Sequence, residues 1–76
     1  MLKDLKSYFI SEKELNNFML SEGFKKDNSE EYHSQFVYYN NNTTVVINYE
    51  LEDDIYFILD NSFYYCNNGI CFNLFE

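Results

Sequence analysis

The residues of this 76-residue chain that could do chemistry are mostly carboxylates. Glu50, Glu52, Asp53 and Asp54 form the densest acidic group, and Asp60 follows shortly after them. Carboxylate oxygens are the ligands that Ca²⁺ and Mg²⁺ prefer, but this segment lacks the glycine and the spacing of an EF-hand loop. The pattern therefore favours a turn with solvated acids over a metal site.

Two cysteines and one histidine are the remaining candidates. Asn68-Gly69 is typical of a two-residue hairpin turn, and such a turn would place Cys66 directly opposite Cys71, where a disulfide can form. The spacing is not C-x-x-C, so we prefer two free thiols and keep a dithiol redox module as an alternative. His33 has no motif partner and is expected on a strand surface. We predict no enzymatic activity, no catalytic residue, no metal and no cofactor.

Charge is divided unevenly along the chain, whose formal net charge is −8. Residues 1–26 hold all five lysines and four acids, whereas residues 27–76 hold nine acids and no base. Direct binding of nucleic acid through phosphates needs clustered basic residues, so this function is excluded. An apolar content of 46% and an aromatic content of 21% exclude a disordered chain and indicate one small folded domain over 1–76.

Composition also bears on compartment and origin. The first ten residues lack the uninterrupted apolar core of a secretory signal, and no segment approaches the ~20 apolar residues of a membrane span. We expect a soluble, cytoplasmic protein with no membrane partner. The absence of Ala, Arg and Pro, together with many Asn, Phe and Tyr, is typical of an AT-rich genome. Such genomes include those of low-GC bacteria and their phages, so the expected setting is a bacterial host cell.

A helical segment over 1–24 should carry part of the core. Ser11 and Glu14 form a capping box, in which Ser11 accepts from the Glu14 amide and the Glu14 side chain reaches back to the Ser11 amide. Ile10 and Leu15 are spaced for a hydrophobic staple, and Gly23 suits the position after the last turn.

These signals predict a helix over 12–22, with an apolar stripe of Leu15, Phe18 and Met19 facing a sheet. Phe24 would contact Met19 in a Schellman arrangement. Leu2, Leu5 and Phe9 suggest an additional short helix before it.

The remainder, 31–75, is rich in aromatic and β-branched residues and predicts an antiparallel meander of about five strands. The expected strands are Tyr32–Tyr39, Thr43–Leu51, Ile55–Leu59, Phe63–Asn67 and Ile70–Phe75. With the helix on one face, the expected class is a two-layer α+β domain.

Turn lengths then assign side chains to the two faces of the sheet, because directly opposed residues share a face. We expect two-residue turns at 41–42 and 68–69, and three-residue loops at 52–54 and 60–62 that pair Leu51 with Ile55 and Leu59 with Phe63. The helix-covered face would then hold Phe36, Tyr38, Val45, Ile47, Tyr49, Leu51, Ile55, Phe57, Leu59, Phe63, Tyr65, Ile70, Phe72 and Leu74.

The opposite face is the predicted binding surface. It would hold Tyr39, Tyr56 and Tyr64 beside the acidic residues, together with Val37, Val46, Asn48, Ile58, Cys66, Cys71, Asn73 and Phe75. Exposed aromatic surface is typical of interfaces, and carboxylates at its rim would select a basic partner. An ordinary solvated sheet face is the alternative interpretation.

By size, acidity and AT-rich coding, the chain resembles phage-encoded inhibitors of host defence, including anti-CRISPR proteins. That resemblance implies a small acidic inhibitor or regulator that occupies a basic, nucleic-acid-binding surface of a larger protein without itself binding nucleic acid. Toxin-neutralising immunity proteins have the same profile and are one alternative. A homo-oligomeric accessory protein, for example a homodimer joined through the aromatic face, is another.

Overall fold

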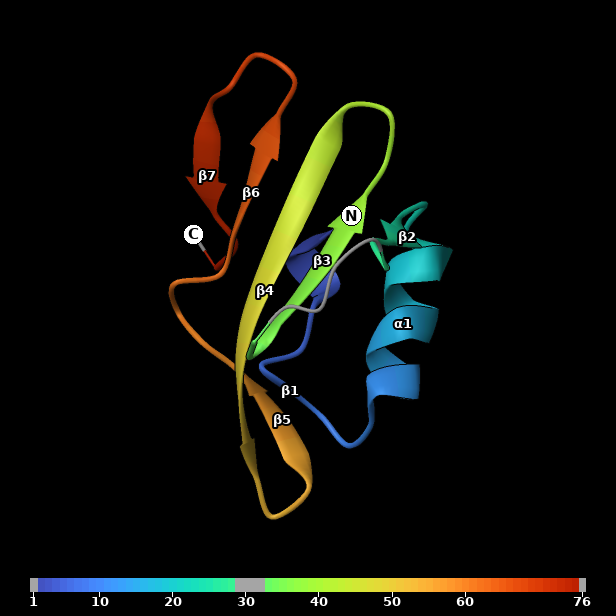
Figure 1. Ribbon diagram of the computed structural model, residues 1–76, viewed down its shortest axis with the longest axis vertical. Coiled ribbons are helices and arrows are strands. Elements are labelled where there is room, and N and C mark those ends of the chain that lie inside the picture. Colours follow the sequence, from blue (N-terminus) through green and yellow to red (C-terminus); the bar gives the residue numbers. More distant parts are fainter. Residues whose placement is uncertain (1, 29–32, 76) are drawn as a thin grey trace.

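The computed structural model describes residues 2–28 and 33–75, and Figure 1 shows their arrangement. One α-helix, α1 (Glu12–Ser21), packs on one face of an antiparallel sheet, which confirms the predicted α+β class. Glu31 and Tyr32, at the start of the predicted sheet, lie outside the described residues. The other elements are η1 (Leu2–Asp4), β1 (Tyr8–Phe9), β2 (Lys25–Lys26), β3 (Gln35–Tyr39), β4 (Thr43–Glu52), β5 (Ile55–Ile58), β6 (Phe63–Cys66) and β7 (Cys71–Asn73).

The long strand β4 is the centre of the sheet. One edge of β4 pairs with β3, in the register that the predicted two-residue turn at 41–42 requires, with Phe36 opposite Ile47. The other edge pairs with β6 over the first half of β4 and with β5 over the second half. The short strands β1 and β2, which the sequence did not predict, add to β5 and β3, and β7 adds to β6.

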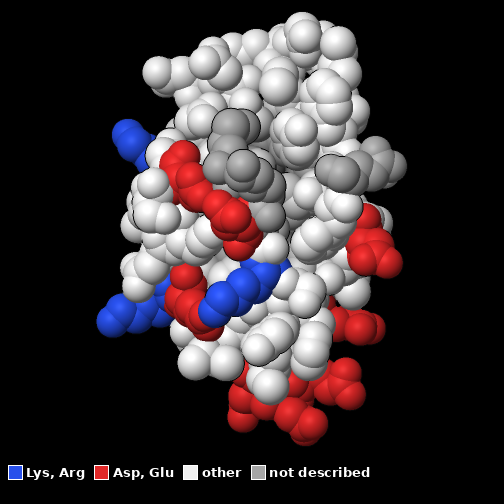
Figure 2. All heavy atoms as spheres, turned by 180° about the vertical axis from the view of Figure 1, so that it is seen from behind, with Lys and Arg blue, Asp and Glu red and all other residues white. Residues whose placement is uncertain are grey.

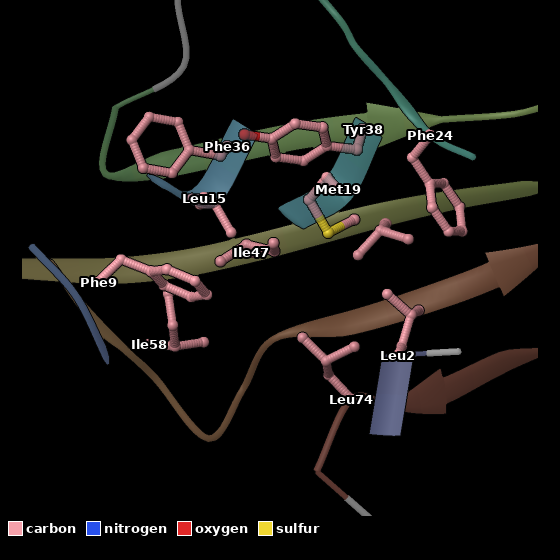
Figure 3. Packing of buried hydrophobic residues seen from close by; sticks show 11 residues of the cluster. Leu2, Phe9, Leu15, Met19, Phe24, Phe36, Tyr38, Ile47, Ile58 and Leu74 are labelled. Carbon is pink, nitrogen blue, oxygen red and sulfur yellow. The ribbon is translucent and has the colours of Figure 1, made fainter. Parts of the chain in front are cut away.

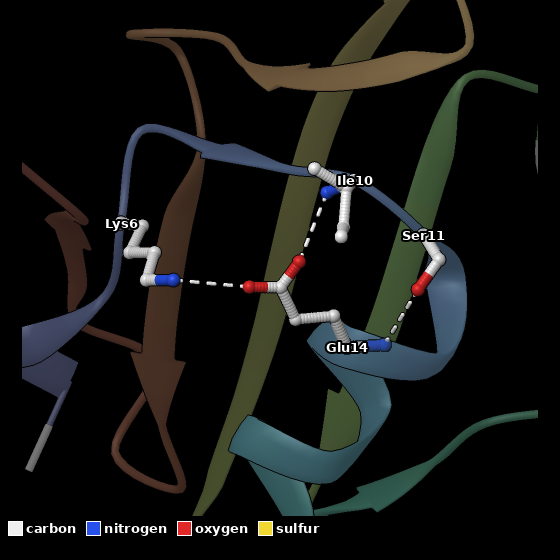
Figure 4. Close-up of polar contacts among 4 residues, drawn as sticks. All are labelled: Lys6, Ile10, Ser11 and Glu14. Carbon is white, nitrogen blue, oxygen red and sulfur yellow. Dashed lines mark hydrogen bonds and ion pairs between the residues drawn. The ribbon is translucent and has the colours of Figure 1, made fainter.

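The start of α1 is capped as the sequence predicts, with one difference (Figure 4). Ser11 Oγ accepts a hydrogen bond of 3.1 Å from the Glu14 amide. The Glu14 carboxylate accepts from the amide of Ile10 at 3.0 Å, one residue earlier than the predicted Ser11 amide. The expected hydrophobic staple is wrong, because Ile10 is 68% exposed while Leu15 is buried.

The end of α1 confirms the predicted Schellman arrangement. Gly23 has a φ of +89°, the left-handed conformation that glycine adopts without a steric penalty. The Phe24 amide donates to the Met19 carbonyl at 2.9 Å, and both side chains belong to the buried core. The predicted N-terminal helix is reduced to η1, since Tyr8 and Phe9 pair with β5 as a strand.

The β4–β5 hairpin turns one residue later than predicted. Glu52 lies opposite Ile55 and Leu51 opposite Tyr56, so the turn consists of Asp53 and Asp54 alone. A shift of one residue moves every β5 side chain to the other face of the sheet. Tyr56 and Ile58 therefore face the helix, and Phe57 faces away from it; the predicted faces of these three residues were wrong.

The β6–β7 hairpin differs in the same way. The Cys66 amide donates to the Ile70 carbonyl and Tyr65 lies opposite Cys71, so the loop spans three residues, 67–69. Gly69 takes a φ of +80° at its end, as glycine does in three-residue hairpin loops. The predicted two-residue turn is therefore wrong. The pairing of β6 with β4 places Tyr64 opposite Val45, on the helix side rather than on the predicted uncovered face.

The predicted hairpin at 60–62 is absent, and β5 and β6 instead run in the same direction along one edge of β4. Four residues, 59–62, lie opposite only two residues of β4 and form a bulge. Ser62 is fully buried there, and its hydroxyl accepts from the Asn48 amide at 2.9 Å and donates to the Asn48 carbonyl at 3.2 Å. The Asn48 carbonyl also accepts from the Leu59 amide at 2.8 Å, so the Ser62 hydroxyl replaces the strand partner of the Asn48 amide.

The core lies between α1, η1 and the sheet (Figure 3). Tyr38 is fully buried, its hydroxyl donates to Asn16 Oδ1 of α1, and this burial raises its pKa well above the usual range. The buried cluster consists of Leu2, Phe9, Leu15, Met19, Phe24, Phe36, Tyr38, Val45, Ile47, Ile58 and Leu74.

Candidate protein-binding site

The predicted acidic residues gather on the β4–β5 hairpin at one end of the molecule (Figures 1 and 2). Glu50 and Glu52 alternate along β4 and therefore point away from the helix, about 7 Å apart along the strand. Asp53 and Asp54 form the turn, and all four side chains are exposed. The structure therefore brings these four predicted residues together in one acidic hairpin, the term used below for Glu50–Asp54.

The turn of the acidic hairpin has an uncommon backbone. Asp53 and Asp54 have φ values of +50° and +63°, which are required at both central positions of a type I′ turn. This turn matches the right-handed twist of the strands that it joins, so it holds the hairpin in one register. The carboxylates are consequently presented from a defined scaffold.

Two aromatic residues that sequence reasoning missed lie beside these carboxylates. Phe57 is paired with Glu50 and is 39% exposed; Tyr8 is paired with Phe57 and is 49% exposed. Their ring centroids lie 6.4 Å apart. Together they provide an apolar contact next to the acids, and only the correct turn length and the unexpected strand β1 reveal it.

The other predicted binding residues lie elsewhere. Tyr56 and Tyr64 were expected on the uncovered face, but both face the helix side and pack against the core. Tyr39 is on the uncovered face, but it is paired with Thr44, six residues along β4 from Glu50, or about 20 Å away. Asp60 is exposed in the bulge between β5 and β6, outside the hairpin.

The lysines whose contacts are defined pair with acids of the helix rather than with the acidic hairpin. Lys6 Nζ lies 3.0 Å from Glu14 and Lys26 Nζ lies 2.6 Å from Glu12. The hydrogen bond from Ile10 and the Lys6 ammonium both lower the pKa of Glu14 (Figure 4). Within the described part of the chain, no ion pair joins a lysine to Glu50–Asp54, so these four charges face solvent unneutralised.

Metal and thiol chemistry receive no structural support from the described residues. Within 2–28 and 33–75, no three His, Cys, Asp or Glu side chains are grouped so that they could hold a metal ion. Both cysteines are free, and the predicted placement of Cys66 opposite Cys71 is wrong. Cys66 faces the helix side, near Thr43, whereas Cys71 faces the other side. His33 is exposed in the turn before β3.

Comparisons with protein-family models, with curated proteins and with solved structures find no match. Function must therefore be argued from the site itself. In the described residues, no helix is long and apolar enough to cross a membrane.

The chemistry that the acidic hairpin offers is recognition rather than reaction. Exposed carboxylates accept hydrogen bonds from Lys and Arg, and Arg pairs with them in two parallel bonds. The neighbouring rings of Phe57 and Tyr8 can receive the flat face of a guanidinium or the aliphatic stem of a lysine. The site is thus complementary to a basic surface.

Proposed function

We propose that this protein is a small inhibitor or regulator that lays its acidic hairpin on a basic, nucleic-acid-binding surface of a larger protein. One observation carries the proposal: the four hairpin carboxylates are exposed and unneutralised by lysine among the described residues, while the lysine-paired acids belong to the helix. Rim charges of this kind steer a partner of opposite charge and raise its association rate.

A basic nucleic-acid-binding groove is the surface that best fits such a hairpin. That groove is lined with basic residues that receive a row of phosphates, so it also attracts other rows of anionic groups through electrostatic complementarity. Carboxylates on a hairpin supply the anionic row, and Phe57 and Tyr8 supply apolar contact beside it. The resemblance in composition to phage-encoded inhibitors of host defence, including anti-CRISPR proteins, suggests a nucleic-acid-binding defence protein as the partner.

The test is affinity capture from a bacterial host extract with matched variants as baits. Asp53→Asn/Asp54→Asn removes two exposed charges from the hairpin, and Asn tolerates the left-handed turn. Asp4→Asn/Asp60→Asn removes two exposed charges elsewhere, so both variants have a net charge of −6.

We expect the wild type and the Asp4/Asp60 variant to capture the same basic protein, and the hairpin variant to bind it at least about tenfold more weakly. Added duplex DNA should displace the wild type, and rising salt should weaken its binding. Equal binding of the two variants, or binding that neither DNA nor salt weakens, would contradict the proposal.

A further inference from the structure

The end of the molecule opposite the acidic hairpin is formed largely by segments that carry no charge. Residues 34–49 and 61–75 contain no Lys, Arg, Asp or Glu, although 24% of the whole chain is charged. Their loops meet at that end, where the Asn67 side chain donates to the Asn41 carbonyl at 3.0 Å. Figure 2 shows the result as an uncoloured upper part above an acidic lower end.

The β6–β7 hairpin is the most apolar part of this uncharged end. Tyr65, Ile70 and Phe72 are exposed along it, with Tyr65 on one face of the sheet and Phe72 on the other, and Phe75 is exposed just after β7. Phe72 stacks on Tyr64 with 5.1 Å between ring centroids. Helix α1 lies beside β2 and β3, toward the opposite edge of the sheet from this hairpin (Figure 1), so α1 does not cover it.

Strand β7 is an edge strand of the described sheet, because it pairs there only with β6. Its three residues, Cys71–Asn73, include no lysine and no proline, so its short length is the feature that limits pairing with another strand. Protein interfaces are depleted in charge and enriched in aromatic residues at their centre, which is the composition of this hairpin. The surface is therefore suited to association.

We infer that two copies of this chain associate through their β6–β7 hairpins. In a two-fold symmetric dimer each surface patch meets its own copy, so any charged patch would face an equal charge. In a chain of net charge −8, the uncharged end is where two copies can meet without that repulsion. The acidic hairpins would then lie at the outer ends of the dimer and stay accessible.

The size of the contact is consistent with a reversible dimer. The molecule extends 38 Å along its long axis and 25 by 23 Å across it. Contact over one end would bury on the order of several hundred Å² from each copy, compared with about 800 Å² per partner in stable complexes.

Analytical ultracentrifugation of the full chain at increasing concentration tests this inference, with two matched variants. Ile70→Lys places a charge on the β6–β7 hairpin, where the side chain is 51% exposed. Leu51→Lys makes the same change on the acidic hairpin, where the side chain is 56% exposed. Both variants have a net charge of −7.

We expect a concentration-dependent dimer for the wild type and for Leu51→Lys, and at least a tenfold increase in the dimer Kd for Ile70→Lys. Rising NaCl should strengthen the dimer, because salt screens the repulsion between two anionic copies. This salt dependence is opposite to that expected for binding of a basic partner. Either proposal can therefore be contradicted without the other. A wild-type monomer at millimolar concentration, or an equal effect of both variants, would overturn the inference.

Discussion

The two aspartates at the turn of the acidic hairpin occupy a backbone conformation that Asn-Gly would adopt at lower cost. Left-handed residues other than glycine cost roughly 1–2 kcal/mol each, and Asp and Asn less than most. Asp53 and Asp54 therefore place two negative charges at the turn, where Asn-Gly would give a more stable turn. A local conflict of this kind is expected where function competes with stability.

Asp53→Asn/Asp54→Gly should therefore raise the free energy of unfolding while weakening partner binding. We expect a gain of about 1 kcal/mol, or a rise in Tm of about 4–8 °C for a domain of this size. Thermal unfolding followed by circular dichroism measures it. Asp60→Asn, which changes one exposed loop residue, is the control and should leave Tm nearly unchanged. A loss of stability in the double variant would contradict the turn assignment.

Glu14 links the helix to the segment before it, and it should make the free energy of unfolding depend on pH in the acidic range. Its pKa is lowered from 4.5, first by the hydrogen bond from Ile10 and second by Lys6. A group whose pKa is lower in the folded state than in the unfolded state stabilises the fold at pH values above its unfolded-state pKa. That contribution is lost as pH falls through the folded pKa.

Glu14→Gln should consequently flatten the decrease of stability below about pH 4.5, because no proton is then taken up at this position on unfolding. Urea unfolding at pH values between 7 and 3 measures the slope. Glu50→Gln is the matched control, since the Glu50 carboxylate is exposed and makes no hydrogen bond to a described residue. An unchanged slope for Glu14→Gln would show that the bond to Ile10 is not made by an ionised carboxylate.

At the scale of elements, the bulge between β5 and β6 depends on one hydroxyl. Ser62→Ala would leave the half-buried amide of Asn48 without its partner, whereas the Asn48 carbonyl would keep its bond from the Leu59 amide. Leaving buried polar groups unsatisfied costs roughly 1–3 kcal/mol, so we expect a loss of that size in urea unfolding. Ser21→Ala is the control, because the Ser21 hydroxyl is exposed and bonds only to a carbonyl of its own helix. Equal effects of the two substitutions would contradict the role of Ser62.

The elements that the sequence predicted well are those with unambiguous end signals. Ser11 and Gly23 bound α1, and the asparagines at 41–42 fix a two-residue turn, so α1 and the β3–β4 register follow from local chemistry. The same signals work without any knowledge of the tertiary fold.

The registers of β5 and β6 could not be obtained in that way. Residues 55–58 are apolar or aromatic at every position, so the hydrophobic pattern does not say which face is buried. The turn length alone decides it, and Asp-Asp with two positive φ values is not a recognisable turn sequence. The misplaced tyrosines, Tyr56 and Tyr64, and the missed Phe57 all follow from a one-residue error of this kind.

At the scale of the whole molecule, the two proposed surfaces lie at opposite ends and should be separable. Ile70→Lys should disrupt self-association but keep the basic partner, whereas Asp53→Asn/Asp54→Asn should do the reverse. Sites far apart with no shared contacts usually behave independently, so the combined variant should show the sum of both losses. Sedimentation and partner titration on the same three variants measure this.

Uneven charge should also make the fold itself more stable in salt. Two solvent-accessible ion pairs, Lys6–Glu14 and the partly buried Lys26–Glu12, lose strength as salt rises, but surface pairs contribute at most about 1 kcal/mol each. Against them stands the mutual repulsion in a chain of net charge −8, with four carboxylates concentrated on one hairpin. Repulsion over distances beyond the Debye length of about 10 Å is already screened at 0.1 M salt.

We therefore expect Tm to rise by about 4 °C between 0.02 and 0.5 M NaCl, the shift that roughly 1 kcal/mol produces in a domain of this size. Calorimetry at a concentration that keeps the chain monomeric measures it. Asp53→Asn/Asp54→Asn should show a smaller increase than Asp4→Asn/Asp60→Asn, although both have a net charge of −6, because repulsion is strongest among the crowded hairpin acids. A Tm that falls with salt would mean that the two helix ion pairs, rather than the acidic hairpin, dominate the electrostatics of the fold.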